Sequence, residues 1–414
     1  MNVKIYPFIP CGEIIAPPSK SMAHRLLICS ALKKGNTVIK NVGNSNDVIT
    51  TAKCLNELGA KIRIQDGNAF VEGISQVKKG RILDCGESGS TLRFLIPVAC
   101  ALGADATFTG SAKLLSRPIN VLVDEIKRHG VNADGLSFSG KLKSGEYEID
   151  CSISSQFISG LLMALPYLDG SSELILKGES VSKGYVDLTI SMLEQCGIKY
   201  EKSGNKFIIR GNQEYNLSSE TYCEGDWSGA SYPLVLGAMR GEVTVKGLNL
   251  DSVQGDKEIL KILEKAGAEV LVKENGITVR KATLNCFEYN FDPIPDLAPV
   301  CSALASVAEG ESVFSGISRL KDKESDRVYT TIKTLTIAGI TAEEIDGKIK
   351  IKGGQVKDGS FDGENDHRIV MLATVLGISA EKESFILGAD AVNKSYPDFF
   401  KDLERLGGKV DVDI

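Results

Sequence analysis

One stretch decides how this chain folds: Ala16-Pro17-Pro18-Ser19-Lys20-Ser21-Met22-Ala23-His24-Arg25, which runs on into the largely apolar residues 26–32. The two prolines keep the chain extended just before Lys20. Ser19 or Ser21 can then cap a helix that is apolar on all sides, and such a helix is a buried one. Free N–H groups, the positive end of the helix dipole and two cations gather at its start, which suits an anion. A capped core helix with solvated charges explains the same residues equally well.

Length and composition exclude several classes of protein. A chain of 414 residues is too long for one typical core, so we expect two domains. Its formal net charge of -6 argues against nucleic-acid binding, so any anion site must be local. No apolar run reaches membrane-spanning length and no signal sequence is present, so we expect a cytoplasmic protein without a membrane partner.

Cysteine and histidine usage indicates a protein without metal. The 10 cysteines are scattered without a C-x-x-C pair, which predicts reduced thiols in the core. Only 3 histidines are present and none lies in an H-E-x-x-H arrangement. We therefore expect no metal site.

An internal repeat of about 70 residues runs through the chain. Its first mark is a helix-like run that ends at a glycine, where a helix C-cap favours positive φ. The glycines in question are Gly59, Gly130, Gly197, Gly267, Gly339 and Gly407. Hairpin signals follow most of them, at Asp66-Gly67, Ser203-Gly204, Asn275-Gly276 and Asp346-Gly347.

A second series of helices interleaves with the first, each with a polar start and an apolar body. These helices begin near Ser21, Ser88, Ser154, Asp226, Asp296 and Asp366. The pattern predicts an α/β (α+β) fold of six strand–helix–strand–helix–strand–strand units, arranged as two pseudo-threefold domains. A helical-repeat array is the alternative, but the regular strands oppose it. If the buried helices point their N-termini into one cleft, that cleft is electropositive.

Two turns into buried helices offer hydrogen-bonding groups. Residues 84–93 form a Gly/Ser-rich turn in which backbone N–H groups can approach an oxyanion, although no Walker A lysine follows. The run Ser154-Ser155-Gln156 carries neutral groups that suit hydroxyls or a phosphate. A structural turn in the first case, and helix capping in the second, are the alternatives.

Two further stretches carry acid–base groups. Asp296 follows Pro293-Ile294-Pro295, where it can cap a helix or act as a general base toward a hydroxyl. In the charged run 321–327, helical spacing puts Lys323 and Arg327 on one face with Glu324 beside them; a salt-bridged exposed helix start is the alternative.

Cations recur at equivalent points of the repeats, in a number that fits two anionic substrates better than one phosphate. They are Lys20, Arg25, Arg93, Arg117, Lys323, Arg327, Arg368 and Lys394.

Seven motifs, taken together, resemble the EPSP synthase family and follow its order from Ala16 to Phe400. They are P-P-S-K-S-x-x-H-R, G-E-S-G-S-T-x-R, S-S-Q, I-P-D, K-E-S-D-R, N-D-H-R and N-K-S-Y-P-D-F-F. The resemblance implies two inverted α/β barrel domains, with residues 17–225 in the N-terminal one. Residues 1–16, which include the first strand, join residues 226–414 in the C-terminal one, and the active site lies in the cleft between the two.

The resemblance also implies an activity, a transferase reaction of the shikimate pathway that leads to chorismate and the aromatic amino acids. The enolpyruvyl group of phosphoenolpyruvate passes to the 5-hydroxyl of shikimate 3-phosphate and phosphate is released, without a cofactor. We expect a monomer that binds these anionic small molecules, and glyphosate in the phosphoenolpyruvate site.

Site residues are carried over motif by motif. The family's pattern implies that shikimate 3-phosphate contacts Lys20, Ser21, Arg25, Ser154, Ser155, Gln156, Ser182, Tyr185, Asp296 and Lys323. It implies that phosphoenolpyruvate contacts Lys20, Gly89, Arg117, Gln156, Arg327, Arg368 and Lys394. Asp296 resembles the group that takes the 5-hydroxyl proton, and Glu324 with Lys323 resembles the group that protonates the methylene carbon. Arginines match carboxylate and phosphate bidentately, which accounts for their number.

Two residues depart from the family's pattern, and two rival functions remain. Glu87 stands where many members have asparagine, and Arg319 where some have an asparagine that contacts the sugar acid. The sister transferase that acts on UDP-N-acetylglucosamine carries a reactive cysteine before its R-P motif, whereas residues 111–118 here contain none. A catalytically inactive binding protein on the same scaffold is opposed by Lys20, Asp296, Glu324 and Lys394 occurring together.

Overall fold

The computed structural model describes residues 1–151, 154–178, 183–274 and 276–413. The chain divides into two compact units, each with its own hydrophobic core. Unit 1 comprises Met1–Ser19 and Glu224–Ile414, and unit 2 comprises Lys20–Cys223. None of the helices in the described part of the chain combines the length and apolar character that crossing a lipid bilayer demands.

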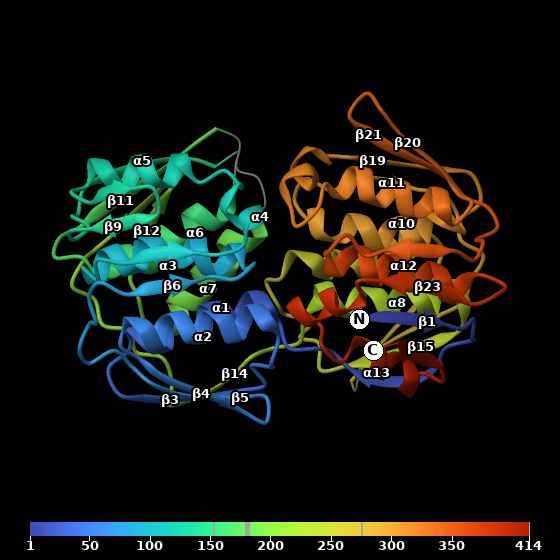
Figure 1. Cartoon of the computed structure of the whole chain (residues 1–414), viewed down its shortest axis with the longest axis horizontal. Coiled ribbons are helices and arrows are strands. Elements are labelled where there is room, and N and C mark those ends of the chain that lie inside the picture. Colours follow the sequence, from blue (N-terminus) through green and yellow to red (C-terminus); the bar gives the residue numbers. More distant parts are fainter. Residues whose placement is uncertain (152–153, 179–182, 275, 414) are drawn as a thin grey trace. The chain divides into compact units, whose positions relative to one another are not determined.

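Unit 2 repeats one motif three times (Figure 1). Its buried helices are α1 (Lys20–Leu32), α3 (Gly89–Leu102) and α6 (Ser155–Ala164). Its outer helices are α2 (Asn46–Leu58), α5 (Asn120–Arg128) and α7 (Lys183–Gln195). The short helix α4 (Ala112–Leu115) precedes α5, and the 3₁₀ turn η1 (Leu165–Tyr167) follows α6.

Each sheet of unit 2 has four strands, in which a parallel pair is extended by an antiparallel hairpin. The first is β14 (Glu220–Tyr222), β3 (Asn36–Lys40), β5 (Asn68–Glu72) and β4 (Lys61–Gln65). The second is β6 (Ile82–Asp84), β7 (Thr107–Thr109), β9 (Ser137–Ser139) and β8 (Asn132–Asp134). The third is β10 (Glu146–Asp150), β11 (Ser172–Lys177), β13 (Lys206–Ile209) and β12 (Tyr200–Ser203).

Unit 1 repeats the same motif, again three times. Its buried helices are α8 (Trp227–Arg240), α10 (Ala298–Ser306) and α12 (His367–Ser379). Its outer helices are α9 (Ile259–Lys265), α11 (Arg327–Ile337) and α13 (Phe399–Arg405). Its 3₁₀ turns are η2 (Gly255–Glu258), η3 (Pro295–Leu297), η4 (Ser318–Asp322) and η5 (Ala389–Lys394).

Unit 1 also has three four-stranded sheets, and two of them take a strand from the start of the chain. The first sheet consists of β16 (Glu269–Lys273), β17 (Gly276–Arg280), β15 (Glu242–Lys246) and β2 (Cys11–Ile15). The second is β18 (Glu288–Asn290), β19 (Glu311–Ser315), β21 (Lys348–Lys352) and β20 (Thr341–Ile345). The third is β22 (Ser360–Asp362), β23 (Ser384–Leu387), β1 (Asn2–Ile5) and β24 (Val410–Asp413). Val3 therefore pairs with Ile386 on one side and with Val412 on the other.

The repeat predicted from the sequence is confirmed, together with the signals that revealed it. All six glycines at the helix ends have positive φ, from 73° at Gly197 to 119° at Gly59. Asp66 and Gly67 both have positive φ in the tight turn between β4 and β5, and so do Asp346 and Gly347 between β20 and β21. Asn275, predicted in a third such turn, lies outside the described residues.

The cysteine prediction holds only in part. All ten cysteines carry free thiols and eight are buried, but Cys11 and Cys286 are exposed. The expectation of core thiols is wrong for these two, because Cys11 begins a strand at the edge of its sheet and Cys286 precedes one.

Gln254 ties the two crossing segments of the chain together within unit 1. Its side-chain amide is 5 % exposed and donates to the Glu224 carboxylate and to the Gly225 carbonyl, both at 2.8 Å. Its oxygen accepts from the Trp227 backbone at 3.2 Å and from the Ser19 hydroxyl at 3.3 Å. The segment that leads into α1 is thereby anchored to the segment that leads into α8.

Gly73 allows the closest backbone approach in unit 2. A Cβ at this position would stand 1.8 Å from the carbonyl oxygen of Lys33, in the turn that follows α1. We predict that Gly73→Ala costs about 3 kcal/mol, because backbone must move to admit the methyl group. Gly67→Ala is the matched control: its φ is +71° but the space is open, so it should cost about 1 kcal/mol. Urea unfolding followed by circular dichroism measures both, and equal midpoints would contradict the prediction.

Candidate functional site

Asp296 lies in η3, where three cations surround its carboxylate. Oδ1 lies 2.9 Å from Arg327 Nη1 and 3.5 Å from Lys323 Nζ, and Oδ2 lies 3.2 Å from Arg368 Nη2. The Asp296 side chain is 15 % exposed, so it is held firmly and can still be reached from solvent. Of the alternatives left open by the sequence, the capping function is wrong, since α10 begins after Leu297 without a side-chain cap.

Arg327 connects this carboxylate to two others. Its Nε donates to Asp366 Oδ2 at 2.8 Å and its Nη2 donates to Asp366 Oδ1 at 3.1 Å, while Nη2 also contacts Glu324 Oε2. Burial alone would lower the pKa of Arg327, but Asp366, Glu324 and Asp296 together raise it well above its ordinary value. Arg327 therefore stays charged although its side chain is only 1 % exposed.

Arg368 and Lys394 are buried as well, whereas Lys323 is half-buried. Arg368 Nη1 donates to the Asp296 carbonyl at 3.1 Å, and its buried Nε has no hydrogen-bond partner within the ranges that the structure describes. Lys394 Nζ donates to the Asn365 carbonyl at 2.5 Å. Burial opposes the charge of Arg368, but Asp296 raises its pKa above the ordinary value. Burial lowers the pKa of Lys323, and the attraction of Asp296 offsets this only in part.

The helical interpretation of residues 321–327 is wrong. The 3₁₀ turn η4 ends at Asp322, Lys323 is extended, and α11 begins only at Arg327. Asp326 is the N-cap, because its carboxylate accepts from the N–H groups of Val328 and Tyr329 at 3.1 Å. The side chains of Lys323 and Arg327 still lie near each other, because both contact Asp296 Oδ1.

In unit 2, Lys20 and Arg25 lie in the first two turns of α1, as predicted. Lys20 Nζ lies 3.0 Å from Asp47 Oδ2 on α2, and both side chains keep some exposure. Arg25 is 2 % exposed; its Nε donates to Thr189 Oγ1 at 2.8 Å, and its Nη1 donates to the Ser21 carbonyl at 2.7 Å. Its Nη2 donates to the Tyr185 carbonyl at 2.9 Å. Burial among neutral partners lowers the pKa of Arg25 to about 10.

Gly89 lies among three polar side chains at the start of α3. A Cβ here would stand 3.1 Å from Arg117 Nη1, 3.8 Å from Gln156 Oε1 and 3.9 Å from Arg93 Nη1. Gln156 is fixed at both ends, since Arg93 Nη1 donates to its oxygen at 2.7 Å and its nitrogen donates to Ser90 Oγ at 2.9 Å. Arg117 Nε is buried without a hydrogen-bond partner in the described part of the chain.

The other predicted residues of unit 2 have mixed outcomes. Ser154 caps α6 by accepting from the Gln156 N–H at 3.3 Å, and Ser155 is 5 % exposed beside it. Tyr185 lies in α7 and its carbonyl accepts from Arg25. Ser182 lies outside the described residues.

Sequence reasoning missed two carboxylates and left two departures open, at Glu87 and Arg319. Asp47 belongs to no motif, so its ion pair with Lys20 was not predicted. Asp366 was predicted as the start of a helix, but its ion pair with Arg327 was not. Arg319 is now explained: its Nε donates to Asp292 Oδ1 at 3.3 Å, so its guanidinium neutralises a neighbouring carboxylate.

No group of three or more potential metal ligands occurs among residues that the structure describes.

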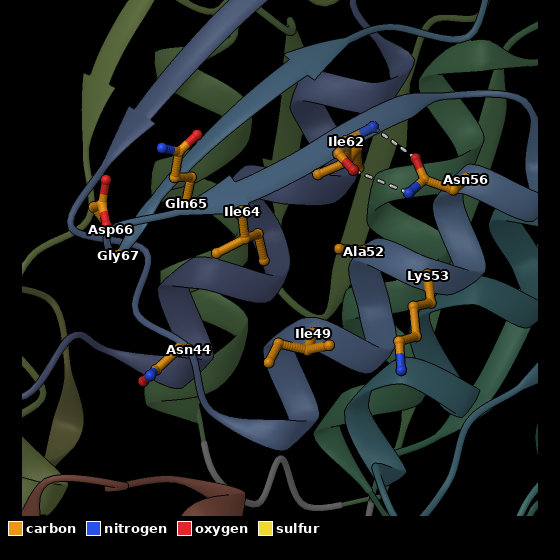
Figure 2. Close-up of a pocket in the computed structure, with 10 residues that line it drawn as sticks. All are labelled: Asn44, Ile49, Ala52, Lys53, Asn56, Ile62, Ile64, Gln65, Asp66 and Gly67. Atoms are coloured by element: carbon orange, nitrogen blue, oxygen red, sulfur yellow. Dashed lines mark hydrogen bonds between the residues drawn. The ribbon is translucent and has the colours of Figure 1, made fainter.

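A pocket of about 480 Å³ lies between α2 and the β4–β5 hairpin (Figure 2). Ile49, Ala52 and Ile64 form its apolar wall. The side-chain amide of Asn56 makes two hydrogen bonds with the backbone of Ile62. Lys53 supplies its ammonium group, and none of the predicted site residues lines it.

Comparison with known proteins gives one consistent result. The family model described as EPSP synthase (3-phosphoshikimate 1-carboxyvinyltransferase) matches residues 11–403. The 3-phosphoshikimate 1-carboxyvinyltransferase of Clostridium novyi is 38% identical over 430 residues, covering 99% of this chain and 98% of that protein. The protein of the same name from Clostridium kluyveri is 40% identical over 412 residues, covering 97% of this chain and 96% of its own.

Solved structures agree on the fold. The EPSP synthase of Acinetobacter baumannii superimposes with a TM-score of 0.83 at 23% identity, over 99% of this chain and 100% of that one. The enolpyruvyl transferase NikO of Streptomyces tendae superimposes with a TM-score of 0.80 at 15% identity, over 99% and 98%. These likenesses confirm the predicted α/β architecture, and the match over nearly the whole length shows that the chain belongs to the EPSP synthase family.

Proposed function

We propose that this protein transfers the enolpyruvyl group of phosphoenolpyruvate to the 5-hydroxyl of shikimate 3-phosphate and releases phosphate. The observation that carries the proposal is the Asp296 carboxylate, which three cations hold while it remains 15 % exposed. A carboxylate fixed in this way suits the general base that an attacking hydroxyl needs. The names of the family and of the relatives from Clostridium support the same reaction.

The reaction is an addition followed by an elimination. The 5-hydroxyl oxygen forms a bond to C2 of phosphoenolpyruvate while its proton passes to Asp296, and C3 takes a proton from the Glu324 carboxyl group. In the elimination, C3 returns its proton to Glu324, the C2–C3 double bond forms again, and the bond from C2 to the phosphate oxygen breaks. The departing phosphate takes the proton that Asp296 accepted, which regenerates both groups. Lys323 supports the acid step as a cation beside Asp296, at 3.5 Å from its carboxylate.

The cations have the task of holding two anions and the departing phosphate. We propose that Lys20, Ser21, Arg25, Ser154, Ser155, Gln156, Ser182 and Tyr185 contact shikimate 3-phosphate together with Asp296 and Lys323. We propose that Gly89, Arg117, Arg368 and Lys394 contact phosphoenolpyruvate, with Lys20 and Gln156 shared. Arg117 Nε and Arg368 Nε are buried donors that find no hydrogen-bond partner among the described residues, and they suit such an acceptor. Arg327 already contacts three carboxylates, so a ligand carboxylate would compete with them for this guanidinium.

A coupled assay tests the proposal. Phosphate release from phosphoenolpyruvate is measured with shikimate 3-phosphate, with UDP-N-acetylglucosamine and without an acceptor. We expect release only with shikimate 3-phosphate. Release with the nucleotide sugar alone would identify the sister transferase, and no release in any arm would indicate a binding protein.

Asp296→Asn should keep both substrates bound and lower kcat by about 10²- to 10⁴-fold, because the amide keeps the size of the carboxylate and loses its basicity. Asp322→Asn, an exposed change at the end of η4, is the control and should leave kcat unchanged. Steady-state kinetics measures both variants. A folded Asp296→Asn enzyme with wild-type turnover would show that another group is the base.

Lys20→Met should weaken binding of both substrates about tenfold to a hundredfold, since charge-assisted hydrogen bonds to two anions are lost. The loss is deepened because Asp47 then keeps its negative charge without the ammonium group at 3.0 Å. Isothermal titration with each substrate measures the change, and the exposed Lys34→Met is the control. Wild-type affinity for both substrates would remove Lys20 from the site.

Gly89→Ala should weaken glyphosate more than phosphoenolpyruvate. The new methyl group would stand 3.1 Å from Arg117 Nη1, and a longer ligand tolerates the resulting shift less well. We expect the inhibition constant of glyphosate to rise more than the KM for phosphoenolpyruvate. Gly354→Ala, whose Cβ would meet Ile340 at an ordinary 3.8 Å, is the control. Equal increases in the two constants would be evidence against crowding at Gly89.

A further inference from the structure

Four buried side chains in unit 2 form a continuous row of hydrogen bonds that ends beside Gly89. His24 Nδ1 lies 2.7 Å from Thr51 Oγ1, which lies 2.6 Å from Thr91 Oγ1, which donates to Ser88 Oγ at 2.7 Å. The first three residues are 0% exposed and Ser88 is 1% exposed. The row runs from α1 through α2 to the N-cap of α3, so it connects three consecutive helices of the unit.

Counting hydrogens along the row determines the tautomer of His24. Each threonine hydroxyl has one hydrogen to donate. Thr91 gives its hydrogen to Ser88, so it must accept from Thr51. Thr51 has then used its own hydrogen, so it must accept from His24 Nδ1. The imidazole is therefore protonated at Nδ1 and bare at Nε2.

The surroundings of the ring agree with this assignment. His24 Nε2 is buried without a hydrogen-bond partner in the described part of the chain, and a bare acceptor there costs less than a stranded N–H would. The ring stands at 88° to that of Phe94, with centroids 6.4 Å apart. Burial, with help from Lys20 and Arg25, lowers the pKa of His24 well below its ordinary value, so the ring is neutral.

The far end of the row fixes the turn at the start of α3. Ser88 Oγ accepts both from the Thr91 hydroxyl and from the Thr91 N–H at 3.2 Å, which defines where α3 begins. Gly89 follows directly, within reach of Arg117 and Gln156. The segment on the other side of Ser88 is closed by a bond from the Ser88 N–H to the Cys85 carbonyl at 2.9 Å.

We infer that His24 is a positioning residue: as the neutral Nδ1–H tautomer it holds Thr51, Thr91 and Ser88 in order, and so sets the place of Gly89 in the phosphoenolpyruvate site. The role of Gly89 rests on the proposed function, whereas the tautomer of His24 does not. His24 itself touches no substrate. Its side chain acts through two threonines on the helix start that the ligand meets.

The tautomer is measured directly by long-range ¹H–¹⁵N correlation of the imidazoles in the full-length, histidine-labelled protein. Only 3 histidines are present, and the spectrum of His24→Gln assigns the relevant signal by its loss. We expect a protonated Nδ1 and an unprotonated Nε2 at pH 7.5. The Nε2–H tautomer or an imidazolium would overturn the inference, whatever the activity of the protein.

Kinetics tests the positioning role. Thr51→Val removes the hydroxyl and keeps the shape, so the His24 signal should lose its single-tautomer pattern and the KM for phosphoenolpyruvate should rise about threefold to tenfold. The KM for shikimate 3-phosphate should change less than twofold. Thr51→Ser keeps the hydroxyl and should restore both the tautomer and the KM.

Thr334→Val is the matched control, because the bond that this buried hydroxyl makes in the described part of the chain stays within its own helix, to the Thr330 carbonyl at 2.7 Å. An unchanged KM for phosphoenolpyruvate in a folded Thr51→Val enzyme would overturn the positioning role. If Thr51→Val does not fold, Thr51→Ala takes its place, with the same two expected changes and the same contradicting result.

Discussion

The structure of unit 1 depends on the bidentate ion pair between Asp366 and Arg327, in which neither side chain is more than 1% exposed. Asp366 also accepts from the Arg368 N–H at 2.9 Å and so begins α12. Arg327 begins α11 and contacts Asp296, which lies just before α10. One buried pair thus joins the starts of three consecutive helices, α10, α11 and α12. Removing either partner leaves an uncompensated buried charge, which typically costs about 3 to 5 kcal/mol.

The two units stabilise the cations of the candidate site in different ways. In unit 1 the cations Lys323, Arg327 and Arg368 all contact one carboxylate, so they lie close together without strong mutual repulsion. In unit 2, Arg25 is surrounded by neutral oxygens and Lys20 has a single carboxylate partner. An acidic protein with a net charge of -6 can therefore present local positive groups, because each is placed by specific contacts rather than by an excess of basic residues.

The sequence predicts well whatever is determined locally. Glycines at helix ends, polar caps such as Ser88 and Asp226, and apolar helix bodies are all short-range signals, and they revealed the repeat. Asp296 shows the limit: its place after Pro295 predicts a cap as readily as a base, and its ion pairs with Arg327 and Arg368 join it to helices far along the chain. The bond between Lys20 and Asp47 and the row from His24 to Ser88 join separate helices, so no periodicity could reveal them.

The insertion of β1 between β23 and β24 has a consequence for synthesis on the ribosome. Val3 leaves the exit tunnel long before its partners Ile386 and Val412 are made. Unit 2 is one continuous segment, Lys20–Cys223, and can fold while the second half of the chain is still being translated. Asn2–Ile5 must meanwhile wait as an unpaired strand with exposed backbone groups, which is the state in which strands associate with the wrong partner. The order of translation thus leaves β1 unpaired until β23 and β24 have both been made.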